Sequence, residues 1–383
     1  MHTRRHFVTA AAAGIAFMLR ESQATTMHST VKHRLLIGTS NTSDDGGAGK
    51  GIYVADFQDG VLSAPLLAVE TRSPGFLATA PHGLLYAQTS PEGGNAEAVS
   101  YRLEGGTAIH PIDHADAGDP GGCHIGVSRD GRCVFVANYS GGNVASFAAT
   151  KDGKLRRASF IQFPPTEHGP VASRQEKSHA HSAITSPDGN YVLVNDLGLD
   201  RIHVFRLDHA TAQLMPHTPS HWSSAPGAGP RHLACHPNGK WIYCINEVGN
   251  TVDQLLWNAT DGTLRTLGTV STLPTDVPTP GAHACELVFA KDLRFLYASN
   301  RTYEGFAVFA LDAATGSLTP IQHIANPGKE SRHLAIDPSG RWFLSANQFS
   351  GDVSVFPIDT ATGMLGERKS SIQVGGASCL LFA

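Results

Sequence analysis

The sequence predicts an all-β fold, a seven-bladed β-propeller closed by a strand from the C-terminus. Three observations lead to this: a turn-rich and charge-poor composition, a strand pattern repeated seven times, and a short apolar segment at the end of the chain. The 383 residues include 40 glycines and 22 prolines, which favours many short strands over long helices. Only 16% of the residues are charged, against about 25% in a typical soluble domain, as expected where strands pack between neighbouring blades.

The first repeated feature is a tight turn between two apolar runs. Asp-Gly and Asn-Gly pairs in this setting are strong hairpin signals. The turns are Pro81-His82-Gly83, Arg129-Asp130-Gly131, Pro187-Asp188-Gly189, Pro237-Asn238-Gly239, Lys291-Asp292-Leu293 and Pro338-Ser339-Gly340.

A second strand, ending in a polar residue, and then an alternating strand follow each turn. The second strands are predicted at Leu35–Thr39, Leu84–Gln88, Val134–Asn138, Val192–Asp196, Ile242–Asn246, Leu296–Asn300 and Phe343–Asn347. The alternating strands begin near Ile52, Val99, Val144, Ile202, Val252, Phe306 and Val353. The unit therefore recurs about every 45 to 58 residues, a period typical of four-stranded propeller blades.

The closure of the ring is also predicted. The first blade begins at its second strand, because no hairpin turn precedes Leu35–Thr39. Its innermost strand is therefore expected from the last apolar segment, Ser378–Phe382. Closing the ring in this way removes exposed sheet edges.

The N-terminal segment is interpreted as an export signal. Thr3-Arg4-Arg5-His6-Phe7 resembles a twin-arginine motif, an apolar run from Val8 to Leu19 follows, and Ser22-Gln23-Ala24 suits a cleavage site. The run is too short to span a membrane, which takes roughly 20 apolar residues. We therefore predict a signal over residues 1–24, a single propeller domain over residues 25–383, a periplasmic location and no membrane association after cleavage.

The charge balance and the cysteines restrict the remaining possibilities. A net charge of −4 excludes the basic surface that nucleic-acid binding requires. The six cysteines form no CxxC motif and lie in apolar, strand-like contexts. We expect them to be buried free thiols rather than disulfides.

The repeat also locates a pocket. In each blade, the start of the innermost strand and the end of the second strand meet at one mouth of the central channel. Six residues before each turn proline, or its equivalent, are Gly75, Cys123, His181, Arg231, Cys285 and Arg332. Directly after the second strands are Ser40, Thr89, Tyr139, Leu197, Glu247, Arg301 and Gln348.

The charged members of these two sets predict the chemistry. His181, Glu247 and three arginines (Arg231, Arg301 and Arg332) are brought to one mouth. We expect His179 beside His181, since residues i and i+2 share a strand face. The arginine surplus suits an anionic ligand, because guanidinium binds carboxylate and phosphate bidentately. Phe163–Lys177 and Leu273–His283 are long connections on this face, either lids or surface loops.

With these residues in place, the chain resembles the seven-bladed propeller lactonase family, which includes 6-phosphogluconolactonases and carboxy-muconate lactonizing enzymes. The resemblance spans about Arg34 to Phe382 and is strongest in four stretches. They are His179-Ala180-His181-Ser182 with Pro187-Asp188-Gly189, Gly229–Ala234 with Asn246-Glu247, Ser299-Asn300-Arg301, and Asp337–Gly340 with Ala346-Asn347-Gln348. Two departures from the family pattern are Thr302, where glycine is usual, and Glu330-Ser331-Arg332, where Pro-Arg is common.

The resemblance implies His181, Glu247, Arg231 and Arg301 as catalytic residues, and the register argument reaches the same four. His179, Arg332, Tyr139 and Gln348 are expected to bind substrate. Either Glu247 or His181 would act as general base on water, with the other orienting it or relaying the proton. Arg231 and Arg301 would stabilise the oxyanion or hold an anionic group.

Three functions compete at this point. The first is hydrolysis of a sugar lactone or its phosphate, and the second is lactonizing isomerisation of an unsaturated diacid. The third is non-catalytic ligand binding by an exported propeller. Export argues against a phosphorylated substrate. We expect a small anionic or sugar lactone substrate, no nucleic-acid partner, a monomer and no cofactor. Although His179 and His181 with Glu247 make a usable ligand set, we expect no metal.

Overall fold

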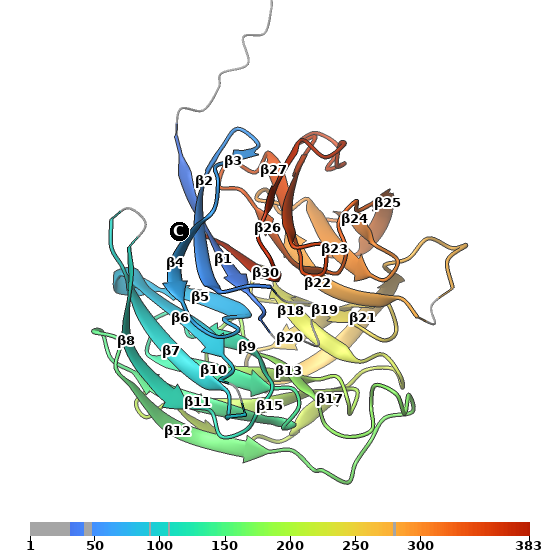
Figure 1. Ribbon diagram of the computed structural model, residues 1–383. Coiled ribbons are helices and arrows are strands. Elements are labelled where there is room, and N and C mark those ends of the chain that lie inside the picture. The colour runs from blue at the N-terminus through green and yellow to red at the C-terminus, as the bar shows by residue number, and fades with distance from the viewer. Residues whose placement is uncertain (1–30, 42–47, 92, 106–107, 279–280) are drawn as a thin grey trace, which may run out of the picture.

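Seven antiparallel sheets surround a central axis in the computed structural model of the protein (Figure 1). The structure describes residues 31–41, 48–91, 93–105, 108–278 and 281–383. The predicted export signal, residues 1–24, lies outside the described residues. Within the described chain, no helix has the length and apolar character of a membrane span.

The first three blades follow the predicted repeat. Blade 1 contains β1 (His33–Thr39), β2 (Gly51–Gln58), β3 (Val61–Leu62), β4 (Leu66–Glu70) and β30 (Ala377–Phe382). Blade 2 contains β5 (Phe76–Ala80), β6 (Leu84–Thr89), β7 (Glu97–Leu103) and β8 (Ile109–Asp116). Blade 3 contains β9 (Gly122–Val127), β10 (Cys133–Asn138), β11 (Asn143–Ala149) and β12 (Leu155–Gln162).

The other four blades are built in the same order. Blade 4 contains β13 (Ala180–Thr185), β14 (Tyr191–Asp196), β15 (Arg201–Asp208), β16 (Gln213–Met215) and β17 (His221–Ser223). Blade 5 contains β18 (Pro230–Cys235), β19 (Trp241–Asn246), β20 (Thr251–Asn258) and β21 (Thr263–Ser271). Blade 6 contains β22 (His283–Phe289), β23 (Phe295–Arg301), β24 (Gly305–Leu311) and β25 (Leu318–Ala325). Blade 7 contains β26 (Ser331–Ile336), β27 (Trp342–Asn347), β28 (Asp352–Pro357) and β29 (Ser370–Gln373).

The predicted ring closure is confirmed. Strand β30 pairs antiparallel with β1, with Leu36 opposite Leu381 and Ile37 opposite Leu380. One hydrophobic cluster joins this sheet to blade 7 and includes Leu380 and Leu344, both buried. The last strand therefore completes the first blade and also packs against the last one (Figure 1).

The predicted turns form with one variation. Gly131, Gly189, Gly239 and Gly340 have φ between 74° and 81°, the left-handed region that glycine adopts without strain. Leu293 takes the same role in blade 6 with φ 62°. In blade 2 the turn is a short 3-10 helix, η2 (Pro81–Gly83), rather than a tight hairpin turn.

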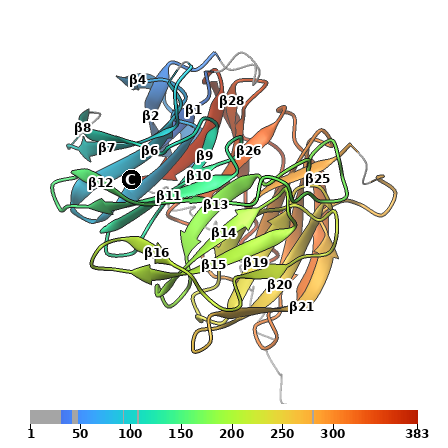
Figure 2. The same cartoon turned by 90° about the horizontal axis from the view of Figure 1, so that it is seen from below.

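The core lies between neighbouring blades rather than at the axis. Seen from below, the inner strands β9, β13 and β26 lie toward the middle, and β12, β16, β21 and β25 lie toward the outside (Figure 2). Tyr86 of blade 2 and Phe147 of blade 3, for example, are buried in one cluster that the two blades share. The six cysteines are free thiols, as predicted.

A β-bulge interrupts six of the seven inner strands near their beginning. In five of them one residue is left out of the ladder pairing: Ser378 in β30, Cys123 in β9, His181 in β13, Arg231 in β18 and Arg332 in β26. In β22 the residues Cys285 and Glu286 together lie opposite Ser299. A bulge bends the strand and redirects the unpaired side chain, so five blades each direct one residue of the inner strand independently of the sheet.

Candidate functional site

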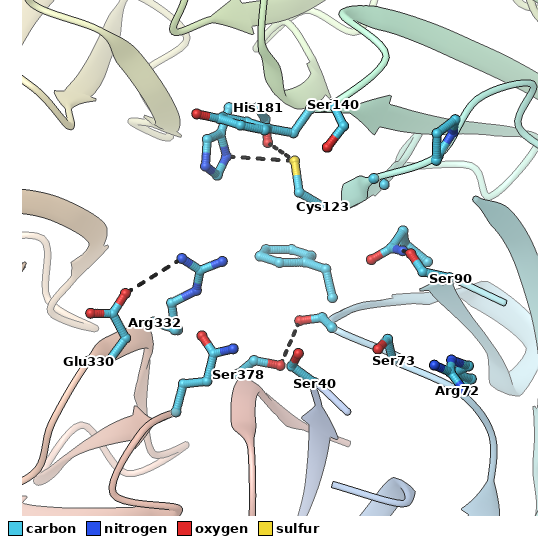
Figure 3. Close-up of a pocket in the computed structure, with 18 of the residues that line it drawn as sticks. Ser40, Arg72, Ser73, Ser90, Cys123, Ser140, His181, Glu330, Arg332 and Ser378 are labelled. Atoms are coloured by element: carbon cyan, nitrogen blue, oxygen red, sulfur yellow. Dashed lines mark hydrogen bonds and ion pairs between the residues drawn. The ribbon is translucent and has the colours of Figure 1, made fainter. Parts of the chain in front are cut away.

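The bulged residues line a pocket at one mouth of the channel. Its volume is about 830 Å³, and Ser378, Cys123, His181, Arg231 and Arg332 all contribute to its wall. Figure 3 shows Cys123 and His181 on one side of the pocket and Glu330, Arg332 and Ser378 on the opposite side. The bulges of five blades therefore bring a serine, a cysteine, a histidine and two arginines to one pocket.

All but one of the predicted site residues line this pocket. Tyr139, Glu247, Arg301 and Gln348, from the ends of second strands, are present together with the bulged His181, Arg231 and Arg332. The exception is His179. It stacks on the Tyr139 ring with centroids 4.3 Å apart, and its Nδ1 lies 3.1 Å from the Tyr139 carbonyl oxygen. The bulge at His181 breaks the i, i+2 alternation, so His179 does not line the pocket and instead packs against the Tyr139 ring.

Glu247 is the centre of the charged cluster. Its side chain is 1% exposed, its Oε2 accepts a hydrogen bond from Arg231 Nε at 3.1 Å, and Arg301 Nη2 lies 2.8 Å from the same oxygen. Burial alone would raise the pKa of Glu247, but the charges of Arg301, Arg174 and Arg231 outweigh it and hold the pKa well below its usual range. Glu247 is therefore a carboxylate at neutral pH.

His181 lies beside this carboxylate. Its Nε2 is 3.7 Å from Glu247 Oε2, and its Nδ1 is 3.8 Å from the Cys123 sulfur. Burial, with the charge of Arg231, lowers the pKa of His181 well below its ordinary value. The imidazole is therefore neutral at pH 7 and can accept or relay a proton.

Arg231 and Arg301 are fixed in place by further contacts. Arg231 Nη1 donates to the Cys285 carbonyl oxygen at 2.5 Å, and Arg301 Nη1 donates to Glu330 Oε1 at 2.6 Å. Both side chains are nearly buried. Nε and Nη1 of Arg231 and both Nη atoms of Arg301 are therefore directed at protein acceptors, above all at Glu247.

Arg332 differs from these two arginines. Its side chain is 26% exposed, and within the described residues its ion pair is a 3.8 Å contact with Glu330 Oε1. Burial and the charges of Arg301 and Arg231 lower its pKa. Arg332 is thus a pocket-facing cation with weak compensation, and it can donate to a ligand oxygen.

Sequence reasoning missed two residues of the cluster. Arg174, from the connection between β12 and β13, contacts Glu247 Oε1. Glu330 is the hydrogen-bond partner of Arg301. It has φ 60° and begins the Glu330-Ser331-Arg332 segment, which departs from the family pattern. The long connection Phe163–Lys177 was the available signal for Arg174, because it lies on the pocket face and carries a basic residue. The other long connection, Leu273–His283, contributes no described residue to the lining.

The described lining carries five arginines and two glutamates. The predicted cationic surplus is therefore present. Its composition differs from the prediction, because Arg72 and Arg174 add positive charge and Glu330 adds negative charge. Thr302 has φ 63°, which explains why glycine is usual at this position in the family that the sequence resembles. Among the described residues, no group of three or more His, Cys, Asp or Glu side chains is arranged to hold a metal ion.

Comparisons with known proteins agree with this geometry. The family model described as a seven-bladed β-propeller lactonase matches residues 34–382. A 6-phosphogluconolactonase from Bacillus subtilis is 31% identical over 349 residues, covering 90% of this chain and 98% of the relative. One from Formosa agariphila is 29% identical over 344 residues, covering 87% and 95%. The solved structure of the periplasmic gluconolactonase of Pseudomonas aeruginosa superposes with a TM-score of 0.85 and 31% identity, covering 92% of this chain and 99% of that one.

Proposed function

The chain belongs to the seven-bladed β-propeller lactonase family, and from this premise we propose that this lactone hydrolase opens a sugar lactone or its phosphate to the acid at the Glu247 pocket. One observation carries the proposal. A buried carboxylate, Glu247, is held between Arg231 and Arg301 and faces the neutral imidazole of His181. A base, a proton relay and cationic donors are the groups that ester hydrolysis requires.

In the proposed mechanism Glu247 acts as the general base. Arg231 and Arg301 hold its Oε2, so the base acts through its Oε1, the oxygen that Arg174 contacts in this structure. The carboxylate takes one proton from the water, and the water oxygen bonds to the lactone carbonyl carbon. General base catalysis of this kind contributes about 10²–10⁴-fold to the rate.

Arg332 and His181 act in the two later steps, the formation of the oxyanion and the protonation of the leaving oxygen. Arg332, with its weak ion pair, stabilises the oxyanion of the tetrahedral intermediate. When the bond from the carbonyl carbon to the ring oxygen breaks, the leaving oxygen takes up a proton. His181, 3.7 Å from Glu247 Oε2, relays that proton from Glu247, and the carboxylate is restored.

We also propose that the protein acts in the periplasm. The twin-arginine-like segment Thr3-Arg4-Arg5-His6-Phe7 supports this, as does the similarity to a periplasmic gluconolactonase. Sequencing the N-terminus of the protein from a periplasmic fraction tests it. Cleavage near Ala24 is expected, whereas an intact Met1 contradicts it.

The activity is tested directly with purified protein and glucono-δ-lactone, 6-phosphogluconolactone and a cis,cis-muconate. Release of acid from a lactone, followed with a pH indicator and corrected for spontaneous hydrolysis, is the expected result. Loss of the muconate diene absorbance without acid release would instead identify an isomerase. The absence of activity on all three compounds would contradict the proposed function.

A further inference from the structure

We propose that Arg174 determines specificity at this site: it binds the negatively charged group, a carboxylate or a phosphate, at the far end of an anionic lactone substrate. The inference rests on the proposed lactone hydrolysis. When Arg174 binds this anionic group, it gives up its contact with Oε1 of Glu247. The charged group of the substrate therefore contributes to catalysis as well as to binding.

Arg174 differs from the other arginines that contact Glu247. Its side chain is 32% exposed, compared with 3% for Arg231 and 9% for Arg301. It contacts Oε1, whereas Arg231 and Arg301 contact Oε2. Its Nε atom is buried without a hydrogen-bond partner. The same holds for Nε of Arg301, so exposure is what sets Arg174 apart: of the three arginines, it is the one that a ligand can reach.

The backbone beside Arg174 is anchored, so the side chain can move while its base stays in place. Gln175 is fully buried, and its Nε2 donates to the Leu197 carbonyl oxygen at 2.9 Å and to Asp200 Oδ1 at 2.7 Å. Its Oε1 accepts from the Val171 amide at 3.1 Å. An arginine on a fixed backbone can change partners at a small entropic cost, because only its own rotamers are involved.

The present contact of Arg174 makes Glu247 a weak and covered base. Glu247 is 1% exposed while Arg174 lies on Oε1. An anionic group on the substrate offers Arg174 another partner, and charge-assisted pairing of this kind is strong in a partly buried pocket. Once Arg174 leaves, Oε1 faces the pocket, and the carboxylate has lost one of the charges that weaken it as a base.

The charge environment of Glu247 indicates how large this effect is. The titratable and charged groups that face it come from several blades: Arg174, Arg231, Arg301, Arg332, His181, Tyr139, Cys123, His232 and His283. Four of these groups are arginines. Removal of one arginine therefore raises the basicity of Glu247 without leaving the carboxylate unpaired.

Arg332 is the alternative anion-binding residue, and its position argues for a different role. It stands in the bulge of inner strand β26, beside Arg301 and Glu330. Figure 3 shows it on the wall opposite His181. We assign it to the oxyanion, which every lactone substrate develops. Its loss is therefore expected to affect neutral and anionic lactones alike.

The first test compares three lactones on the wild-type protein. They are glucono-δ-lactone, which is neutral, a glucarolactone, which carries a carboxylate, and 6-phosphogluconolactone, which carries a phosphate. We expect kcat/KM to be at least about tenfold higher for one or both anionic lactones, and the two arms separate carboxylate from phosphate. Equal values for all three overturn the inference while leaving lactone hydrolysis intact. Failure on all three contradicts the hydrolase itself.

The second test uses Arg174→Gln, with Arg156→Gln as the matched control. Arg156 is an exposed arginine of β12 outside the pocket lining, so its variant should behave as wild type. For Arg174→Gln we expect kcat/KM on the preferred anionic lactone to fall about 10- to 100-fold. We expect kcat on glucono-δ-lactone to rise about two- to tenfold, because Oε1 is uncovered.

The pH profile distinguishes this role from a merely structural one. In Arg174→Gln the acid limb of kcat/KM for glucono-δ-lactone should lie about one pH unit higher, because Glu247 loses a nearby positive charge. Arg174→Lys should restore part of the preference for the anionic lactone. If Arg174→Gln keeps that preference, or if Arg332→Gln abolishes it while Arg174→Gln does not, Arg174 is not the anion-binding residue.

Discussion

Nε2 of His181 lies 3.7 Å from Oε2 of Glu247, and the two side chains are 5% and 1% exposed. One is a neutral imidazole, because burial and the charge of Arg231 lower the pKa of His181, and the other is a carboxylate, because the surrounding arginines outweigh burial and lower the pKa of Glu247. Both groups are therefore in their basic forms at neutral pH, and a proton that Glu247 takes from water can be relayed through the neutral imidazole.

Replacing Glu247 by Gln should lower kcat on a lactone substrate at least about 100-fold, because the base is lost. The thermal midpoint should also fall, since three arginines lose their buried counter-charge. Steady-state assays, run where circular dichroism shows the variant folded, test this. The control is Glu70→Gln, at an exposed position of β4, which should match wild type. Turnover of Glu247→Gln within a few-fold of wild type would remove Glu247 from the chemistry.

Stability should decrease as the pH falls below about 6.5. His124, His181 and His232 are buried and His333 is half-buried, and the pKa values of all four are lowered, chiefly by burial. A histidine whose folded pKa is below its unfolded value binds its proton first in the unfolded state. At high pH such a histidine does not change the stability. Below pH 6.5 it lowers the free energy of unfolding by up to about 1.4 kcal/mol per pH unit.

Urea midpoints at pH 8, 7, 6 and 5 measure this effect. They should be level between pH 8 and 7 and decline below 6.5. In His124→Gln, which removes one titrating group, the decline should be shallower. Glu247, whose pKa is also lowered, adds to the loss only below its unfolded pKa of about 4.5. Constant midpoints from pH 8 to pH 5 would contradict this account.

Deleting residues 379–383 should prevent soluble folding. The deletion removes most of β30, the inner strand of blade 1, in which Cys379 and Leu380 are each 1% exposed. It would uncover β1 as a sheet edge and open the joint with blade 7. Deletion of Ala383 alone is the control and should be tolerated. A soluble truncation with the wild-type melting temperature would refute the closure.

The six thiols should be free and unreactive in the folded protein. Burial raises the pKa of Cys133 to about 11 and that of Cys123 and Cys379 to about 12, which suppresses the reactive thiolate. A thiol reagent should titrate six groups in urea but react slowly with the native protein. Cys123 and Cys235, the two that are not fully buried, should react first. A melting temperature that a reductant lowers would indicate a disulfide instead.

The fold could be predicted because each blade repeats the same local signals. The turn glycines and the apolar strands recur in register, and the missing first strand of blade 1 had one candidate, the last segment of the chain. The pocket register was predictable for the same reason. The bulge lies at a constant distance before each turn, so counting back from Pro187 or Pro237 reaches His181 or Arg231.

The residues that could not be predicted lie where the repeat is interrupted. Arg174 comes from a connection between blades, and these connections differ in length and sequence, so the blade alignment says nothing about it. His179 was expected to face the pocket, but alternation holds only in a regular strand, and the bulge at His181 ends it. Glu330 depends on a left-handed backbone conformation that its residue type does not favour.

The inner-strand bulges have a consequence for how this protein can change. A residue outside the ladder pairing can be exchanged without altering strand register, because its neighbours on both sides keep their partners. The same scaffold can therefore present a thiol, an imidazole or a guanidinium at equivalent places, as Cys123, His181 and Arg231 do. New substrate ranges can arise by single substitutions at these positions, so a library for directed evolution would begin there.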